Sequence, residues 1–398
     1  MEMDYFKESL MLHKRLKGKI SITPKIDVQT KEQLSLVYSP GVAEPCLEIQ
    51  RNPESVWEYT IKNNMVAVVS DGSAVLGLGN IGAHAAIPVM EGKALLFKRF
   101  ANIDAFPICI DSQDVDKIVE TVKLIAPVFG GINLEDIAAP RSFEVEARLQ
   151  DLGIPVFHDD QHGTAIVVLA ALLNAVKVVN KKMSDLKVVI NGAGAAGIAI
   201  ARLLKSVDYS GNVHNVEVED IIICDTKGVI HADRDDLNDA KREALEYTNK
   251  LGVKGSVKDA LKDADVFIGV SVGNLLTADD VRKMAKDSII LALANPTPEI
   301  MPEEAYKGGA AIVGTGRSDL PNQVNNVLGF PGVFRGALDA RAHSISPAMK
   351  MAAAFAIAEC VSKPHDRLII PPSLDEQVAW RVAAAVKEAA LKENNGKH

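Results

Sequence analysis

Two pairs of adjacent acidic residues are candidates for binding a divalent cation. Glu135-Asp136 and Asp159-Asp160 each follow an apolar or turn segment. Carboxylates that converge on one point are hard oxygen ligands, which suit Mg²⁺ or Mn²⁺ and are poor ligands for zinc. Acid pairs are more often solvated loop charge. A metal site is favoured here because the polar run 158–164 is wedged between two apolar segments, where polar groups need partners.

A tyrosine and a lysine are candidates for proton transfer. Tyr38 lies in a turn-like segment, and Lys93 leads into the apolar run 94–97, which is expected to be a buried strand. Burial there would lower the pKa of Lys93 and make it a usable base. A Tyr–Lys pair can shuttle protons to and from an enolate. The alternative is a packed tyrosine and a lysine whose stem lies along apolar surface.

Asparagines mark a further candidate site. Asn295 follows a predicted strand at 288–293, and Asn325 and Asn326 precede a glycine-rich turn. Ligands of open α/β sheets bind beyond the C-terminal ends of the strands. Asn295 is therefore placed to meet substrate or coenzyme, unless it serves only as a turn residue before proline.

Only one of two GxGxxG motifs stands in the context of a dinucleotide site. It joins the predicted strand 187–191 to the predicted helix 198–204, where its glycines allow a tight turn and the helix N-terminus faces the pyrophosphate. The next strand ends in Asp225, which could accept the ribose hydroxyls; the polar segment 208–220 is expected to be a loop that absorbs its greater distance. The pyrophosphate-binding residues would be Gly192, Gly194, Ala195, Ala196 and Gly197.

The first copy of the motif, 77–82, is interpreted as a structural turn or as a loop that lets the backbone approach a ligand. Pro88 follows it closely and should interrupt any long helix.

These sites require two α/β domains. Short apolar runs alternate with helical segments from residue 185 onward, which predicts a doubly wound, mostly parallel sheet of Rossmann type. Residues 1–160 are expected to form a smaller α/β domain, and residues 161–398 the Rossmann domain with C-terminal helices. The expected strands are 65–69, 94–97, 107–110, 187–191, 221–224, 266–268, 288–293 and 311–313, and the expected helices are 112–125, 143–150, 164–179, 198–204 and much of 346–392.

Composition excludes other classes of protein. The chain of 398 residues has a net charge of −8, which argues against nucleic-acid binding. No segment reads as a membrane span or signal peptide. Four scattered cysteines fit buried thiols in a reducing compartment. We expect a cytoplasmic globular protein without nucleic-acid or membrane partners.

Together the motifs resemble the malic enzyme family in its short bacterial form. The matching segments lie in order over roughly residues 20–380. They are Val37-Tyr-Ser-Pro-Gly-Val-Ala43, Val75-Leu-Gly-Leu-Gly-Asn-Ile-Gly82, Glu91-Gly-Lys-Ala94, Asn133-Leu-Glu-Asp136, His158-Asp-Asp-Gln-His-Gly-Thr164, Asn191-Gly-Ala-Gly194, Ala294-Asn-Pro-Thr297 and Val324-Asn-Asn-Val-Leu-Gly-Phe-Pro-Gly332.

The resemblance implies oxidative decarboxylation of L-malate to pyruvate and CO₂ with NAD(P) and Mg²⁺ or Mn²⁺, and decarboxylation of oxaloacetate as a possible side reaction. It implies that Lys93 is the general base, tuned by Asp159, and that Tyr38 is the general acid that protonates C3. The implied metal ligands are Glu135, Asp136 and Asp160, and the implied substrate ligands are Lys93, Asn295 and Asn326.

Some features depart from the family pattern or leave alternatives open. The segment 71–76 lacks the arginine that larger members use for a substrate carboxylate, and Arg317 is a candidate replacement. Asp225 favours NAD over NADP, although Lys227 could pair with a 2′-phosphate. The resemblance also suggests a homodimer, in which Tyr38 could reach the active site of the partner subunit.

Three other functions remain as alternatives. Malolactic conversion would use the same scaffold with tightly held NAD and release lactate. A non-catalytic nucleotide sensor would not need this set of acids, tyrosine and lysine. An amino-acid dehydrogenase would combine similar domains and a lysine but would not need the carboxylate cluster.

Overall fold

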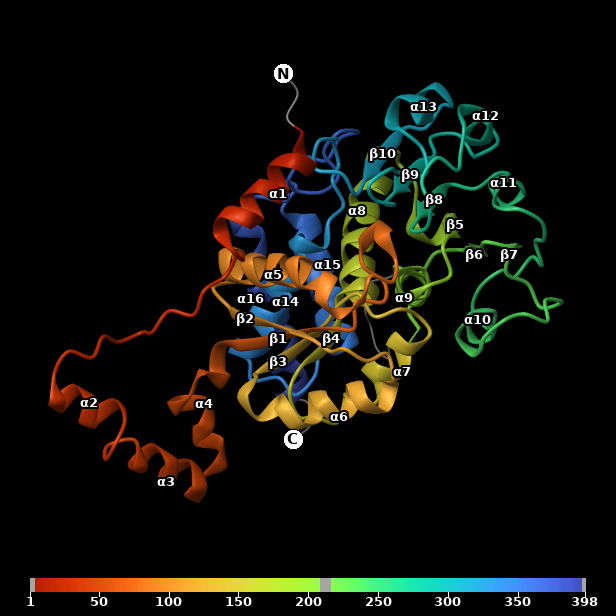
Figure 1. Ribbon diagram of the computed structural model, residues 1–398. Helices are drawn as coiled ribbons and strands as arrows, with labels where there is room; N and C mark the ends of the chain where they lie inside the picture. Colours follow the sequence, from red (N-terminus) through yellow and green to blue (C-terminus); the bar gives the residue numbers. More distant parts are fainter. Residues whose placement is uncertain (1–3, 208–215, 396–398) are drawn as a thin grey trace.

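The computed structural model describes residues 4–207 and 216–395. Within them lie a four-stranded sheet and a six-stranded sheet, separated by a layer of helices (Figure 1). Most of the predicted loop 208–220 falls at residues 208–215, outside the described residues.

The smaller sheet is built from the N-terminal part of the chain. Its order is β2-β1-β3-β4, and every pair is parallel. The strands are β1 (Met65–Ser70), β2 (Asp104–Cys109), β3 (Gly131–Leu134) and β4 (Val156–His158). Parallel strands end at one edge, so β3 and β4 bring the two acid pairs that follow them to neighbouring positions.

The larger sheet confirms the predicted doubly wound architecture. Its order is β10-β9-β8-β5-β6-β7, with only the short β7 antiparallel. The strands are β5 (Lys187–Asn191), β6 (Asp220–Asp225), β7 (Gly228–Val229), β8 (Val266–Gly269), β9 (Ile289–Ala292) and β10 (Ile312–Thr315). The order reverses beside β5, so the glycine motif that follows β5 opens at the switch point where such folds bind ligands.

A helical layer joins the two sheets. The apolar helix α8 (Thr164–Val178) packs against α15 (Pro347–Glu359), while α14 (Phe330–Asp339) and α16 (Glu376–Asn395) pack against α5 (Gly82–Ala101). The Phe97 ring lies 4.7 Å from Phe330 and 5.4 Å from Phe334, centroid to centroid, which fixes α5 against α14. The predicted C-terminal helical segment is thus two helices, with an irregular stretch between them.

The expected strand at 94–97 is wrong, because these residues belong to α5. A short apolar run does not by itself distinguish a strand from a buried helix. Ala83, Ala86, Met90 and Ala94 are buried at spacings of three or four residues, which is the helical period.

The expectation that Pro88 interrupts a helix is also wrong. Pro88 lies inside the 20-residue helix α5. Its missing N–H costs one helical hydrogen bond. The helix continues because its buried face packs on both sides of the proline.

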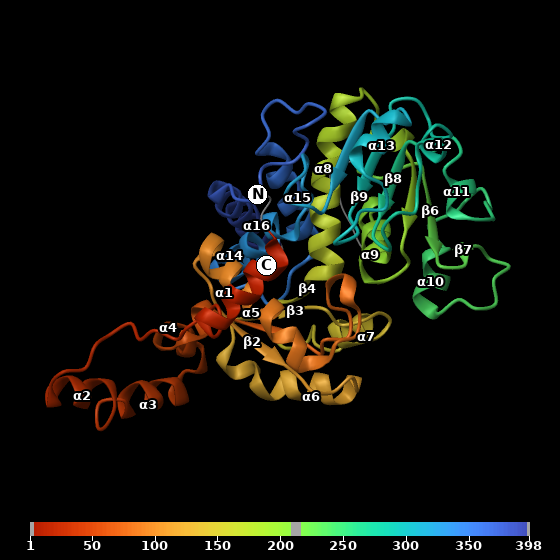
Figure 2. The same ribbon diagram turned by 45° about the horizontal axis from the view of Figure 1, so that its top comes forward.

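The N-terminal segment forms an arm that projects from the body (Figures 1 and 2). It carries α2 (Lys31–Val37) and α3 (Ala43–Arg51), neither of which has a buried residue. Its exposed apolar side chains are Ile22, Ile26, Val28, Leu34, Leu36, Val37, Val42 and Leu47. Helices this short are marginal in water without packing.

The other helices are short or peripheral. They are α1 (Tyr5–Leu16), α4 (Val56–Tyr59), α6 (Val115–Ile125), α7 (Arg141–Ala147), α9 (Ala195–Leu204), α10 (Asp239–Ala244), α11 (Val257–Ala260), α12 (Ala278–Val281) and α13 (Pro302–Lys307). Among the described residues one segment, Asp159–Val178, is long and apolar enough to cross a membrane by length and composition, but 72% of its apolar window is buried inside the protein. A core helix between two sheets accounts for that composition.

Candidate active site

Lys93 is held between two carboxylates at the centre of the candidate site. Its Nζ lies 2.6 Å from Asp159 Oδ2 and 2.9 Å from Glu135 Oε1. It also lies 4.2 Å from the centroid of the Phe330 ring. The lysine side chain is 10% exposed and Asp159 is fully buried. Lys93 therefore reaches the acids from the middle of α5, not from the head of a strand.

The electrostatics of Lys93 differ from the expectation. Burial by itself lowers the pKa of Lys93, but the charges and hydrogen bonds of Asp159 and Glu135 raise it above its ordinary value. The expectation that desolvation would leave the lysine with a lowered pKa is therefore wrong. The lysine and its two acids are a tightly coupled ion cluster.

Three acids converge as a candidate metal centre. Ligand oxygens of Glu135, Asp136 and Asp160 lie within 4.8 Å of one another. Asp160 Oδ2 also accepts a 2.7 Å hydrogen bond from the Asp136 backbone N–H. Asp136 has a left-handed backbone (φ 54°), which aspartate tolerates better than most residues. The predicted carboxylate set is thus brought together.

The residues fit a divalent cation. Burial, opposed by Lys93, combines with the nearby carboxylates of Asp160, Asp159 and Asp136 to raise the pKa of Glu135 well above its ordinary value. Acids packed this closely repel one another when ionised. A cation with hard oxygen preference would relieve that repulsion and is matched by an all-carboxylate donor set.

A single π-helical turn, η5 (Asp159–Gly163), carries both Asp159 and Asp160. Such turns are frequent at functional sites. Asn326 Nδ2 donates a 3.0 Å hydrogen bond to Asp159 Oδ2, the same oxygen that faces Lys93. The turn also packs against α9, the helix that follows the glycine motif. Lys93 with its two acids, Asn326 and helix α9 thus lie close to one another around η5.

The glycine motif has the geometry of a pyrophosphate cradle. Gly192 has φ of 129°, a conformation that favours glycine, and a Cβ on Gly197 would lie 1.7 Å from Gly192 O. A Cβ on Gly194 would meet nothing within 4 Å, so the space outside the turn is open. Helix α9 begins at Ala195 and has no side-chain cap. Its first N–H groups are available to an anion, which fits a dinucleotide pyrophosphate.

Asp225 ends β6 beside this cradle, as expected. Asn191 of β5 is paired with Cys224 of β6, so Asp225 lies next to the glycine turn. Its carboxylate is, however, bound by Arg234 and Lys241, two residues that sequence reasoning did not select.

Asn295 lies beyond β9 and at the first glycine motif. A Cβ on Gly77 would lie 2.3 Å from Asn295 O, so this turn brings the two parts of the chain together. This close approach supports the interpretation of the first GxGxxG motif as a structural turn. No described hydrogen bond joins Asn295 to Lys93 or the acids.

Tyr38 is not brought to the other site residues within one chain. It follows α2 on the projecting arm and is 68% exposed. The described residues show no hydrogen bond from its side chain. Arg317 is likewise occupied elsewhere, by Asp319 at 2.6 Å.

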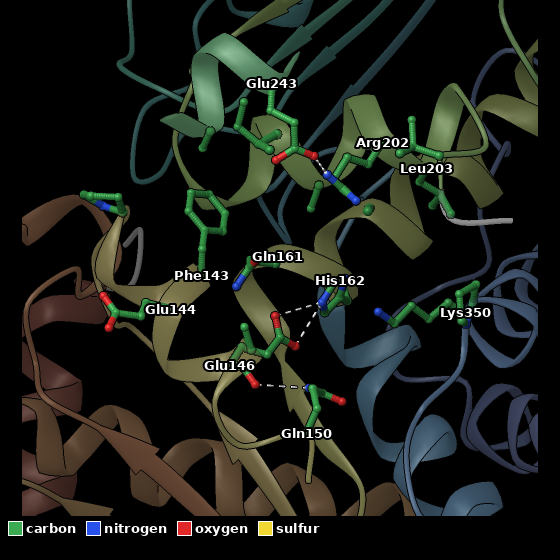
Figure 3. A pocket seen from close by; sticks show the side chains of 18 of the residues that line it. Phe143, Glu144, Glu146, Gln150, Gln161, His162, Arg202, Leu203, Glu243 and Lys350 are labelled. Carbon is green, nitrogen blue, oxygen red and sulfur yellow. Dashed lines mark hydrogen bonds and ion pairs between the residues drawn. The ribbon is translucent and has the colours of Figure 1, made fainter. Parts of the chain in front are cut away.

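Sequence reasoning missed a second polar cluster, formed around Glu146 (Figure 3). Glu146 accepts a 3.0 Å hydrogen bond from the His158 backbone and contacts His162 Nε2 at 2.9 Å. Together with Gln161 these side chains line a cavity of about 650 Å³ between α7, α9 and α15. A lone glutamate on a helix carries no spacing signal that could have identified it.

We expect Glu146→Ala to destabilise the fold by about 1–3 kcal/mol at neutral pH, because buried donors lose their acceptor. Burial by itself raises the pKa of Glu146, but His162 and Lys350 lower it to about 2. The ionised group is thus favoured by folding, so its contribution is present above about pH 4.5 and is lost as the pH falls toward 2. Urea unfolding of Glu146→Ala against Glu144→Ala, an exposed neighbour, should show this pH dependence; equal stabilities would contradict it.

Comparisons with known proteins agree with this geometry. The malic enzyme N-terminal domain family matches residues 17–150, and the malic enzyme NAD-binding domain family matches residues 161–391. A bifunctional malic/malolactic enzyme of Bacillus subtilis is 58% identical, over 98% of this chain and 94% of that protein. An NAD-dependent malic enzyme of Geobacillus stearothermophilus is 54% identical, over 94% and 77% respectively.

A solved structure gives the same result. The malic enzyme of Pyrococcus horikoshii is 50% identical and superposes with a TM-score of 0.90, over 96% of this chain and 91% of that one. Both parts of the chain and the whole fold therefore match one family. This protein belongs to the malic enzyme family.

Proposed function

We propose that this protein oxidatively decarboxylates L-malate to pyruvate and CO₂, with reduction of NAD(P) and dependence on Mg²⁺ or Mn²⁺. The observation that carries the proposal is the buried lysine paired with two carboxylates, one of which belongs to the three-acid cluster. The malic activities named for the two relatives above support the same reaction.

The chain's own residues would divide the reaction between them. When bound, the cation supplies a Lewis acid at the C2 oxygen, and the nicotinamide accepts hydride. A cation on Glu135 would neutralise one of the two carboxylates that raise the pKa of Lys93. The neutral lysine would then accept the C2 hydroxyl proton, while Asp159 holds the lysine in place and adjusts its proton affinity. Asn326 fixes the Asp159 carboxylate and, with Asn295, is proposed to bind substrate.

The proposed general acid, Tyr38, requires a second copy of the chain. Its arm exposes a row of apolar side chains and buries none of α2 or α3, so the arm lacks a packing partner within one subunit. A homodimer in which each arm lies on the other subunit would cover that surface and bring Tyr38 to the partner's lysine cluster. Tyr38 would there deliver a proton to C3 of the enolate.

Mixed dimers test this arrangement. We expect Tyr38→Phe and Lys93→Arg each to lower kcat by about 10²–10⁴-fold when pure, because each removes a proton-transfer group. Co-expression with two different tags allows the dimer containing one copy of each variant to be isolated. One of its two sites then has an intact Lys93 and an intact Tyr38, so it should recover about half the wild-type activity.

Mixed dimers without activity would contradict the exchange of arms. Without exchange each site would take Tyr38 and Lys93 from the same chain, so each of the two sites would carry one substitution. Tyr59→Phe is a suitable control, since it is another exposed tyrosine near the base of the arm. It should leave kcat unchanged.

Malolactic conversion remains a second candidate, since the Bacillus subtilis relative is named for both activities. The same lysine and acids would serve it, with the coenzyme retained and lactate released.

Two more proposals rest on the sequence. They are a division of the chain at residue 160 and a location in the cytoplasm, the latter supported by the four free cysteines.

A further inference from the structure

Asp225 is fully engaged by protein groups. Its Oδ1 accepts from the Lys227 backbone N–H at 2.9 Å and from Arg234 Nη1 at 2.8 Å. Its Oδ2 accepts from Arg234 Nη2 at 2.9 Å and from Lys241 Nζ at 2.7 Å. A carboxylate has about four lone-pair positions. These four bonds fill them, so the ribose hydroxyls cannot be accepted without displacing a partner.

The side chains around Asp225 are partly buried and joined into a network. Arg234 is 9% exposed, Asp225 10% and Lys241 20%. Arg234 gives its remaining N–H groups to Asp236 and to the carbonyl oxygens of Gly228 and Val229, so all five of its donors are used. Lys241 Nζ, which carries three donors, bonds only Asp225 among the described residues, and the exposed Lys227 contacts Asp236 at 2.8 Å. Burial by itself raises the pKa of Asp225, but the hydrogen bonds from Arg234 and Lys241 lower it to about 2, so it stays ionised at neutral pH.

The balance of charge in this network is positive. Three cations, Lys227, Arg234 and Lys241, are joined to two carboxylates, Asp225 and Asp236. The cluster lies at the end of β6, beside the glycine turn. In Rossmann folds this is where the adenosine ribose sits, and where a basic residue accommodates a 2′-phosphate.

We propose that Asp225 does not bind the ribose but, together with Arg234, holds Lys241 beside Lys227 as an anion site, so that the chain prefers the 2′-phosphorylated coenzyme, NADP, over NAD. This coenzyme preference deepens the proposed function and rests on it for the reaction that the coenzyme serves. The binding of the two coenzymes can be measured whether or not that reaction occurs. It reverses the preference that Asp225 suggests in the sequence alone. A carboxylate at the end of this strand discriminates against phosphate only while it carries an uncompensated charge.

Binding of the nucleotides in the absence of malate tests the site. NADPH and NADH are titrated into the full-length protein, and their fluorescence gives the two dissociation constants. We expect NADPH to bind at least about tenfold more tightly, since it adds charge-assisted hydrogen bonds to the same contacts. Adenosine 2′,5′-bisphosphate should likewise displace NADPH more effectively than 5′-AMP does.

Three variants locate the effect. Lys241→Gln and Arg234→Gln should each weaken NADPH by about tenfold or more and leave NADH within about threefold. Lys227→Gln is the variant that cannot disturb the core, because its side chain is 67% exposed, and it should weaken NADPH by a smaller factor. Lys258→Gln, a lysine on α11 paired with Asp280, is the control that should change neither nucleotide.

Tighter binding of NADH than of NADPH by the wild-type protein would overturn the proposal. Equal losses for the two nucleotides in the Lys241 and Arg234 variants would do the same, since they would indicate a structural role. Malate-dependent reduction of the coenzyme is measured separately. If malate reduces neither coenzyme, the proposed reaction fails while the ratio of binding constants still decides the coenzyme site.

Discussion

Lys93→Arg should yield a folded protein whose kcat is lowered by about 10²–10⁴-fold. The guanidinium keeps a positive charge between Asp159 and Glu135, the two carboxylates that contact Lys93 at 2.6 and 2.9 Å. Arginine does not lose its proton in proteins, so it cannot act as the base for the C2 hydroxyl. Steady-state kinetics with L-malate and unfolding by urea would separate the two properties.

Lys93→Arg tests the proton transfer more specifically than Lys93→Ala does. Alanine leaves two buried carboxylates without their cation, which is strongly destabilising, so lost activity could reflect lost folding. Lys98→Ala is the matched control, because Lys98 lies on the same helix and is 56% exposed. Wild-type kcat in a folded Lys93→Arg protein would show that Lys93 is not the base that accepts the C2 hydroxyl proton.

Removal of the divalent cation should abolish turnover. Glu135, Asp136 and Asp160 are the only acids among the described residues that converge as a metal-binding group. Chelation by EDTA should therefore abolish activity, and Mn²⁺ should restore it. Mn²⁺ should also raise the midpoint of thermal unfolding, because it binds the folded state.

Asp160→Asn is the variant that locates the cation. It removes one ligand charge and leaves Lys93 with both of its own carboxylates. We expect the dissociation constant for Mn²⁺ to rise at least about 10–100-fold. Asp151→Asn, an exposed acid on the preceding loop, should leave the constant unchanged. Unchanged Mn²⁺ affinity in Asp160→Asn would place the cation elsewhere.

Much of the fold could be predicted from the sequence because its signals are local. The strand 187–191 has the apolar centre Val188-Val-Ile190 and is followed by a glycine turn, and β5 has these same bounds. The run 94–97 is also apolar but belongs to a helix, since burial on a 3.6-residue period decides its structure. Short apolar runs without flanking turns do not carry that information.

The candidate site likewise has parts that a local sequence signal predicts and parts that it does not. The acids that end β3 and β4 could be placed together because parallel strands end at one edge. The partners of Asp225 could not, since Arg234 and Lys241 lie nine and sixteen residues further on and meet it through a hairpin and a helix. Tyr38 has the right motif, but its position depends on how two chains meet, which no single-chain pattern encodes.

The product balance of the reaction with L-malate, Mn²⁺ and each coenzyme tests the proposed reaction most directly. Formation of NAD(P)H is followed by absorbance, and pyruvate and lactate are quantified in the same samples. We expect one NAD(P)H and one pyruvate for each malate consumed, with both lost in EDTA and in Lys93→Arg. Malate consumed to lactate without net NAD(P)H, or no consumption with either coenzyme, would contradict this expectation.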